Sequence, residues 1–378
     1  MLFDKETKVV ETLEQFRQRT SFVYQTFSEG PVSINPNCLK KVNERGEFCQ
    51  FYGDTLVYLL DDKAKDHCRY YRDQLYQYCE DVFAEPLNEE TFHLTLHDLN
   101  NSTDIHSIYF SMEESEKNVK KLMNSLIDDK TIIHLKSTRI INMVNTSLVL
   151  CFEPESEEDC HKLMSYYEMF QKVVPLSYSL TPHITLAYFN AAFDSIDENG
   201  YFRNSYISSK YTKRLKDVVD HLNEMNPMHI ELSVFDLAYQ HFSSMNHFTT
   251  RYQLKESVLI VDAAAFMRKK IADLLKDMSV PVYEAASGSE MIQMLDEINP
   301  SVILLDSHLP DLDSMILLEE LHKEYPYIKV IYMEESSFCH DKAIHLGAVK
   351  CLSKPIDDQQ LICEVQKLLH VDNEERLL

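Results

Sequence analysis

Two short stretches of this sequence carry the same chemical groups at the same spacing. His93 and Thr95 stand in the sequence His-Leu-Thr, and His183 and Thr185 stand in His-Ile-Thr. A histidine can act as a general base or a general acid near neutral pH, and a threonine hydroxyl can donate a hydrogen bond to a phosphate oxygen. Two such pairs in one cleft would support acid–base chemistry on a phosphate ester without a metal ion.

Each pair must be held by a strand, because residues i and i+2 of a strand project from the same face. The sequence predicts two copies of a strand–helix–strand unit, at 55–60, 63–83 and 92–97 and again at 147–152, 156–173 and 183–188. The opening strand begins 38 residues before His93 in one copy and 36 residues before His183 in the other. Matching order and spacing predict two related lobes that meet about a pseudo-twofold axis. The alternative is that these are strand histidines without a chemical role. His97 is expected on the face of His93, as a structural or cleft-lining residue.

The paired motifs resemble those of the two-histidine phosphoesterase superfamily, which includes RNA 2′,3′-cyclic phosphodiesterases, over about residues 30–240. The resemblance implies a hydrolase with an α+β, two-lobed fold, in which one histidine activates water and the other protonates the leaving ribose oxygen. His93 and His183 would be catalytic, in roles that the sequence leaves open, and Thr95 and Thr185 would bind the phosphate. The expected substrate is a cyclic phosphate or phosphodiester of a short RNA or small nucleotide, and no cofactor is expected. A non-enzymatic nucleotide-sensing module is the alternative.

After residue 255 the pattern changes to short apolar runs at 258–261, 302–305 and 330–333, separated by helical periods. Near-continuous apolar strands that alternate with helices are typical of a doubly wound α/β fold with a parallel sheet. Such sheets bind ligands beyond the carboxyl ends of their strands.

Residues 256–370 resemble a response regulator receiver domain, which has a flavodoxin-like fold. The matching stretches are Val258–Asp262, Glu284–Gly288, Val302–Asp313, Leu346–Ala348 and Lys354–Pro355. The resemblance implies that Asp306 is the phosphoacceptor, that Lys354 pairs with the phosphoryl oxygens, and that Asp262 and Asp306 bind Mg²⁺. It also implies two-component signalling, with a histidine kinase, another protein or a second copy of the chain as partner.

Three positions depart from the receiver pattern. Ala263 stands where a second acidic residue follows the first strand, Glu334 stands where the family has Ser or Thr, and Cys351 stands where it has an aromatic residue. The first change weakens a Mg²⁺ site, and the second would repel a phosphoryl dianion. The sequence therefore leaves two readings open, phosphorylation at Asp306 and a pseudo-receiver used for docking or dimerisation.

Composition and charge set limits on the class of protein. The chain is 44% hydrophobic, has a net charge of −24 and contains nine cysteines without a CxxC pair. Both halves are acidic, at −13 before residue 255 and −11 from residue 255 onward, so neither is expected to bind long DNA or RNA. We expect a cytoplasmic bacterial protein without a membrane span.

The remaining expectations concern boundaries. The sequence predicts domains at 1–245 and 256–370, with a linker-like boundary at 240–254 that shows no clear period. It also predicts a helix at about 4–20, a helix at 208–224 and a strand at 228–239.

Overall fold

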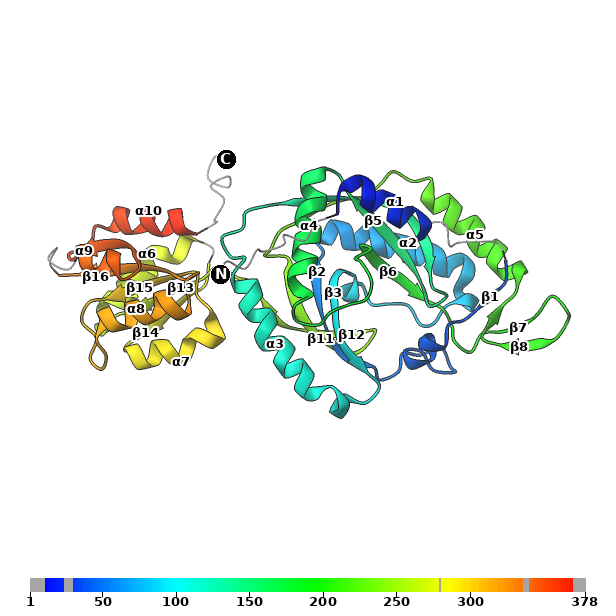
Figure 1. Cartoon of the computed structure of the whole chain (residues 1–378), viewed down its shortest axis with the longest axis horizontal. Helices are drawn as coiled ribbons and strands as arrows, with labels where there is room; N and C mark the ends of the chain where they lie inside the picture. The colour runs from blue at the N-terminus through cyan, green and yellow to red at the C-terminus, as the bar shows by residue number, and fades with distance from the viewer. Residues whose placement is uncertain (1–10, 24–29, 279, 336–339, 370–378) are drawn as a thin grey trace, which may run out of the picture. The chain divides into compact units, whose positions relative to one another are not determined.

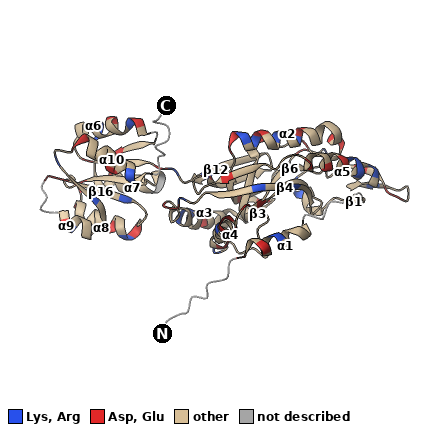
Figure 2. Ribbon diagram, turned by 90° about the horizontal axis from the view of Figure 1, so that it is seen from above, with Lys and Arg blue, Asp and Glu red and all other residues tan. Residues whose placement is uncertain are grey.

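The computed structural model describes residues 11–23, 30–278, 280–335 and 340–369. The chain divides into two units, Met1–Leu254 and Lys255–Leu378. Basic and acidic residues alternate along the same outer helices, as on α2 (Asp62–Cys79) in Figure 2. In the described part of the chain, no helix combines the length and the apolar character that a bilayer span requires.

Two antiparallel four-stranded sheets form the framework of the first unit (Figure 1). The first sheet has the order β12-β11-β2-β3 and the second has the order β10-β4-β5-β6. The strands are β2 (Tyr52–Leu59), β3 (His93–Ser102), β4 (Ile133–Met143), β5 (Ser147–Pro154), β6 (His183–Tyr188), β10 (His229–Leu232), β11 (Leu237–Ser244) and β12 (His247–Gln253). Two small sheets pair β1 (Val32–Ser33) with β9 (Tyr206–Ile207) and β7 (Asp194–Ile196) with β8 (Phe202–Asn204).

Helices separate the strands of each predicted repeat. The Asp61 side chain accepts a hydrogen bond from the Ala64 amide at the start of α2, and Ser156 does the same for Asp159 at the start of α4. Such caps satisfy amides that have no partner inside the helix. The helices are α1 (Leu13–Val23), α2, α3 (Tyr109–Asn124), α4 (Glu157–Phe170) and α5 (Ser209–Asn223), with short 3₁₀ turns at Pro36–Lys40, Glu80–Val82, Glu89–Thr91 and Ile105–Ser107.

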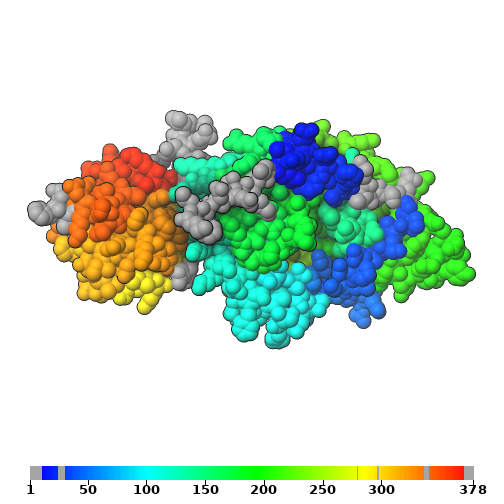
Figure 3. Space-filling model, in the orientation of Figure 1, coloured from blue at the N-terminus to red at the C-terminus, as the bar shows by residue number. Residues whose placement is uncertain are grey.

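The first helix starts later than the sequence predicted. Residues 1–10 lie outside the described residues, and α1 begins at Leu13 and ends at Val23 rather than at residue 20. Thr12 Oγ1 accepts a hydrogen bond from the Gln15 amide while Gln15 Oε1 accepts one from the Thr12 amide, a reciprocal cap that fixes this start. In Figure 3, α1 (dark blue) lies on the surface next to the green region that contains α4, and the Leu13 amide donates to Glu157.

The two predicted repeats agree down to an irregularity in their strand pairing. On β3, Thr95 pairs with Val57 and His97 with Leu56, which leaves Leu96 as an extra residue. On β6, Thr185 pairs with Val149 and Ala187 with Leu148, which leaves Leu186 as an extra residue. Each motif strand thus carries a β-bulge directly after its threonine. Bulges are designed features that redirect side chains, so the shared position supports the relation between the two lobes.

The boundary predicted at 240–254 contains two strands, and the chain divides only at the end of this range, between Leu254 and Lys255. Residues 240–244 belong to β11 and residues 247–253 form β12, so the expected domain end at 245 falls in the turn of a β-hairpin. The pairing of β11 with β12 shifts register twice, which breaks the period-2 pattern that would have identified a strand. The single strand predicted at 228–239 is also two strands, β10 and β11, separated by a turn in which the Ser233 amide donates to Asp236.

The second unit is a five-stranded parallel sheet in the order β14-β13-β15-β16-β17. Every residue of β13 is fully buried, because helices cover both faces of the sheet. α6 and α10 pack on one face, and α7, α8 and α9 pack on the other. The elements are β13 (Val258–Val261), α6 (Ala265–Leu275), β14 (Val282–Ala285), α7 (Gly288–Ile298), β15 (Val302–Asp306), α8 (Ser314–Glu324), β16 (Lys329–Glu334), α9 (His340–His345), β17 (Ala348–Ser353) and α10 (Asp358–Leu368), with a 3₁₀ turn at Lys276–Met278. This strand order is that of the flavodoxin-like fold.

Candidate functional sites

A cavity of about 570 Å³ in the first unit is lined by all four motif side chains. His93 and Thr95 reach it from β3, the edge strand of one sheet, and His183 and Thr185 reach it from β6, the edge strand of the other. The two edge strands contact each other. The structure therefore brings the predicted catalytic and phosphate-binding residues together.

The two histidines are anchored in the same way. His183 Nδ1 lies 2.7 Å from the Thr181 carbonyl oxygen, and His93 forms the corresponding hydrogen bond to the Thr91 backbone. Since a carbonyl oxygen only accepts, Nδ1 must donate, and the neutral imidazole then keeps Nε2 as its acceptor. His183 therefore has the tautomer that a general base at Nε2 requires.

Burial keeps both histidines neutral at pH 7. It lowers the pKa of His93 to about 4, with a further contribution from His183, and it also lowers the pKa of His183. The carboxylate of Asp98, which lines the same cavity, works in the opposite direction on both pKa values. The resting cavity thus holds two bases, and an anion that bound beside them would favour protonation of one ring.

His97 does not share the face of His93, contrary to the prediction. The bulge at Leu96 shifts the alternation, so His97 is 1% exposed, packs its ring 5.2 Å from that of Tyr167 and lies outside the lining of the cavity. Asp98 takes its place in the cavity and accepts a 2.7 Å hydrogen bond from the Tyr178 hydroxyl. The predicted face was wrong because strict alternation does not survive a bulge, whereas the burial of His97 agrees with the structural role that was the other expectation.

Sequence reasoning missed the aromatic and cationic wall of the cavity. Phe242 and Phe248 come from the β11–β12 hairpin, with ring centroids 5.4 Å apart, and Phe248 meets the His93 ring edge-on at 4.9 Å. The Lys41 ammonium lies 5.4 Å from the Phe51 ring centre and 5.3 Å from that of Tyr188. Aromatic faces can stack on a nucleobase, and a lysine held over them can attract a phosphate. The sequence around Phe242 and Phe248 shows no regular alternation that could have identified them.

The second site lies at the carboxyl ends of β13, β15 and β17, where Lys354 joins two buried aspartates. Lys354 Nζ is 2.8 Å from Asp306 Oδ1 and 2.9 Å from Asp262 Oδ2, and the two aspartates are 4% and 1% exposed. Burial lowers the pKa of Lys354, but hydrogen bonds to Asp306 and Asp262 outweigh it and raise the pKa overall. All three predicted receiver-site residues meet at this point.

The donor set at this site fits Mg²⁺ in a minimal form. Mg²⁺ is commonly bound by one or two carboxylates and completes its shell with water and phosphate oxygens. Asp262 and Asp306 would hold it, and Ala263 adds no third carboxylate.

Arg268 borders this site. It donates to the carbonyl oxygens of Asp262 and Ala263 and pairs with Glu284 at 3.2 Å.

The loop after β15 contains a carboxylate, Asp311, whose role is structural. Asp311 accepts hydrogen bonds from the amides of Gly288 and Ser289 at the start of α7. The hydrogen bonds from Ser289 and Gly288 lower the pKa of Asp311 to about 2. Asp311 therefore ties the loop after β15 to a helix N-terminus.

Comparisons with known proteins match the second unit. The response regulator receiver domain model matches residues 258–366. The chemotaxis protein CheY of Listeria monocytogenes is 32% identical over 29% of this chain and 95% of its own length. A protein-glutamate methylesterase/protein-glutamine glutaminase of Syntrophomonas wolfei is 32% identical over 27% of this chain, and the chain spans 30% of that relative's length. The solved receiver domain of the Francisella response regulator 1452 is 25% identical, covers 30% of this chain and 95% of its own, and has a TM-score of 0.29.

Proposed function

The chain belongs to the response regulator receiver family through residues 258–366, and from that premise we propose that it joins a two-component receiver to a metal-independent phosphodiesterase. The receiver resemblance drawn from the sequence is confirmed over this range, and it implies two-component signalling. The phosphodiesterase is our proposal for the first unit.

One observation carries the proposal. Two histidines and two threonines, each pair followed by the same bulge, line one cavity from opposite edge strands. Two anchored imidazoles are what acid–base cleavage of a phosphodiester requires, because one can remove a proton from water while the other gives a proton to the leaving oxygen. If the two histidines had only a structural role, a threonine two residues after each of them and a bulge at the same position would not be expected.

The reaction balances without a cofactor. Nε2 of one histidine would take a proton from water as the water oxygen bonds to phosphorus, and the other histidine, protonated, would donate its proton to the ribose oxygen as the phosphorus–oxygen bond breaks. Thr95 and Thr185 would donate hydrogen bonds to the non-bridging oxygens, which hold the phosphate in line. Asp98 favours the protonated state that the acid needs.

The cavity favours a small substrate. Its volume of about 570 Å³ lies in the range of single-ligand sites, and its wall offers Phe248 and Phe242 for a base and Lys41 for a phosphate. The net charge of −24 disfavours a long polynucleotide. We propose a 2′,3′-cyclic nucleotide or the cyclic-phosphate end of a short RNA as the substrate.

The receiver would regulate this activity through phosphorylation of Asp306. A phosphorus–nitrogen bond of a phosphohistidine on a partner kinase would break as phosphorus bonds to an Asp306 carboxylate oxygen. Lys354, which now contacts both aspartates, would pair with the phosphoryl oxygens. Mg²⁺ bound by Asp262 and Asp306 would offset the added charge.

Hydrolysis of 2′,3′-cyclic nucleotides and cyclic-phosphate-ended oligonucleotides by the full chain, with a chelator present, tests the proposal. We expect turnover by the wild type and its loss in His93→Ala, with the fold checked by circular dichroism. Turnover that survives in His93→Ala, or that appears only when metal is added, would overturn the mechanism.

A second candidate, a nucleotide sensor without turnover, is favoured by the lowered pKa values of both histidines, which disfavour a protonated acid in the resting cavity. Tight calorimetric binding of the same nucleotides with no product formed would select this alternative. Labelling with acetyl phosphate separates the two receiver readings, because a docking pseudo-receiver would take no label at Asp306.

A further inference from the structure

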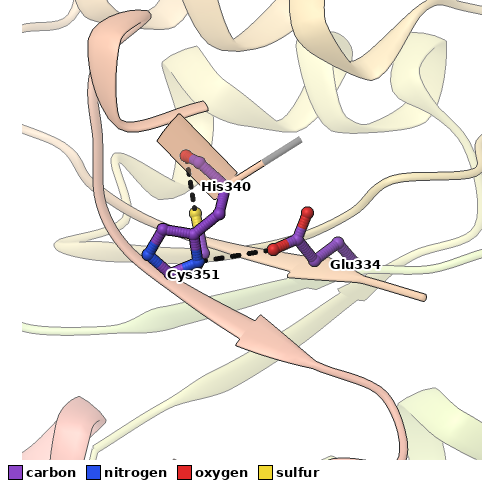
Figure 4. A group of neighbouring side chains, drawn as sticks. All are labelled: Glu334, His340 and Cys351. Atoms are coloured by element: carbon purple, nitrogen blue, oxygen red, sulfur yellow. Dashed lines mark hydrogen bonds and ion pairs between the residues drawn. The ribbon is translucent and has the colours of Figure 1, made fainter. Parts of the chain in front are cut away.

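A group of three metal-binding side chains lies apart from the Asp262–Asp306–Lys354 site on the second unit. Glu334 ends β16, His340 begins α9 and Cys351 lies on β17 (Figure 4). Tyr332 pairs with Cys351 in the parallel ladder, so Cys351 and Glu334, two residues beyond Tyr332, project from the same face of the sheet. α9 packs against β17 and brings His340 to that face.

Glu334 is the observation that calls for a ligand. It is 2% exposed, and among the described residues neither carboxylate oxygen has a hydrogen-bond partner. His340 Nδ1 approaches one oxygen to 3.4 Å, which is an ion-pair distance rather than a good hydrogen bond. A buried carboxylate without hydrogen bonds is costly, and proteins usually satisfy one with a cation or with donors.

The three ligand atoms are nearly placed for one ion. The carboxylate oxygen, the imidazole nitrogen and the Cys351 sulfur all lie within 4.8 Å of one another. Tetrahedral Zn²⁺ with ordinary bond lengths sets its nitrogen, oxygen and sulfur ligands roughly 3.3–3.6 Å apart. Binding would require the side chains to move closer by roughly an ångström. The side chain of His340 is 45% exposed, which leaves a path from solvent.

We propose that Glu334, His340 and Cys351 bind a divalent transition-metal ion, with Zn²⁺ the ion that best matches their chemistry. One thiolate, one imidazole and one carboxylate are the donors that Zn²⁺ accepts, whereas Mg²⁺ and Ca²⁺ prefer oxygen alone. The Cys351 thiol gives up its proton as the sulfur–metal bond forms, and water takes the fourth position. The ion neutralises Glu334 and ties the end of β16 to α9 and β17.

Cobalt titration of the full chain tests this site. The metal-free protein, kept reduced, is titrated with Co²⁺ and the thiolate-to-cobalt absorption band is recorded, followed by displacement with Zn²⁺. We expect the band to saturate at one ion per chain and to disappear as Zn²⁺ replaces Co²⁺. Cys363→Ser, which removes an exposed cysteine from the same unit, should leave the band unchanged.

Ligand variants then locate the ion. Loss of a partner that only orients a ligand costs about 10–100-fold in metal affinity, so Cys351→Ser and His340→Gln should each weaken Zn²⁺ binding by at least about 100-fold. His340 is partly exposed, so His340→Gln remains informative even if Cys351→Ser unfolds. A wild type without the band, or a band that persists in both folded variants, overturns the site.

Discussion

The cavity of the first unit and the aspartate site of the second unit use opposite designs. In the cavity the histidine and the threonine each occur twice, and equivalent bulged strands place the two copies. In the aspartate site the cation occurs once, and this single lysine holds two buried carboxylates. In the cavity two matched residues can divide the same chemical task. In the aspartate site, which has a single cation, both carboxylates depend on Lys354.

The sharpest test of the duplicated design compares His93→Gln, His183→Gln and the double variant. Glutamine cannot exchange a proton at neutral pH, so each single change should lower kcat by about 10²–10⁴-fold. If the two histidines act as one unit, the double variant should be little slower than either single variant. The rates are measured on a 2′,3′-cyclic nucleotide, with exposed His106→Gln as the control. Full activity in one single variant would show that the pair does not work together.

The aspartate site predicts a large effect on stability. Lys354→Met leaves two buried carboxylates without their cation and should lower the free energy of unfolding of the second unit by about 3–5 kcal/mol. Asp306→Asn should restore part of this loss when it is added to Lys354→Met, because it removes one of the two repelling charges. Hydrogen exchange of β13 and β15 in urea measures both effects. Additive losses would contradict the role of Lys354 as the common partner.

The threonines should show a smaller and equal effect. Thr95→Val and Thr185→Val keep the side-chain shape and remove a hydrogen bond to a charged phosphate, which is worth about 1.5–3 kcal/mol. We expect kcat/KM to fall roughly 10–100-fold in each variant. Exposed Thr103→Val is the matched control. A strong effect of only one threonine would mean that the lobes do not share the phosphate.

The pH dependence should reveal the shared environment of the two histidines. Catalysis needs one protonated ring, but burial lowers both pKa values, to about 4 for His93 from an ordinary 6.5. We therefore expect kcat/KM to rise as the pH falls from neutrality through 6.5, until loss of the base reverses the trend. Asp98→Asn, which removes the charge that raises both pKa values, should move the optimum further toward acid. An optimum above neutrality would contradict this assignment.

The sequence predicted those parts of the molecule that depend on regular periods. Apolar runs identified the buried parallel strands of the second unit, and the repeated His-x-Thr pattern identified two of the strands that line the cavity. The hairpin that supplies Phe242 and Phe248 was taken for a domain boundary, because its register shifts break the alternation on which strand prediction depends.

Contacts between segments that lie far apart in the chain could not be predicted from the sequence. The unusual Glu334 and Cys351 were visible as departures from the receiver pattern, but the approach of His340 depends on how α9 packs against β17. In the same way, Lys41 follows a short 3₁₀ turn and reaches the cavity only through the fold around it. No local period marks such a residue.

The two bulged strands also restrict how this chain can vary in length. Each bulge places two consecutive residues on the core side, and this is why Asp98 and Tyr188 face the cavity together with the motif residues. Because strand side chains otherwise alternate with a period of two, loss of one residue from the regular part of either strand, such as Leu94 or Ile184, would turn the residues on one side of it to the opposite face. By contrast, the β7–β8 turn contains Gly200, around which there is open space. Among descendants of this chain, insertions and deletions should therefore collect in such turns, while the two strands that carry His93 and His183 keep their length.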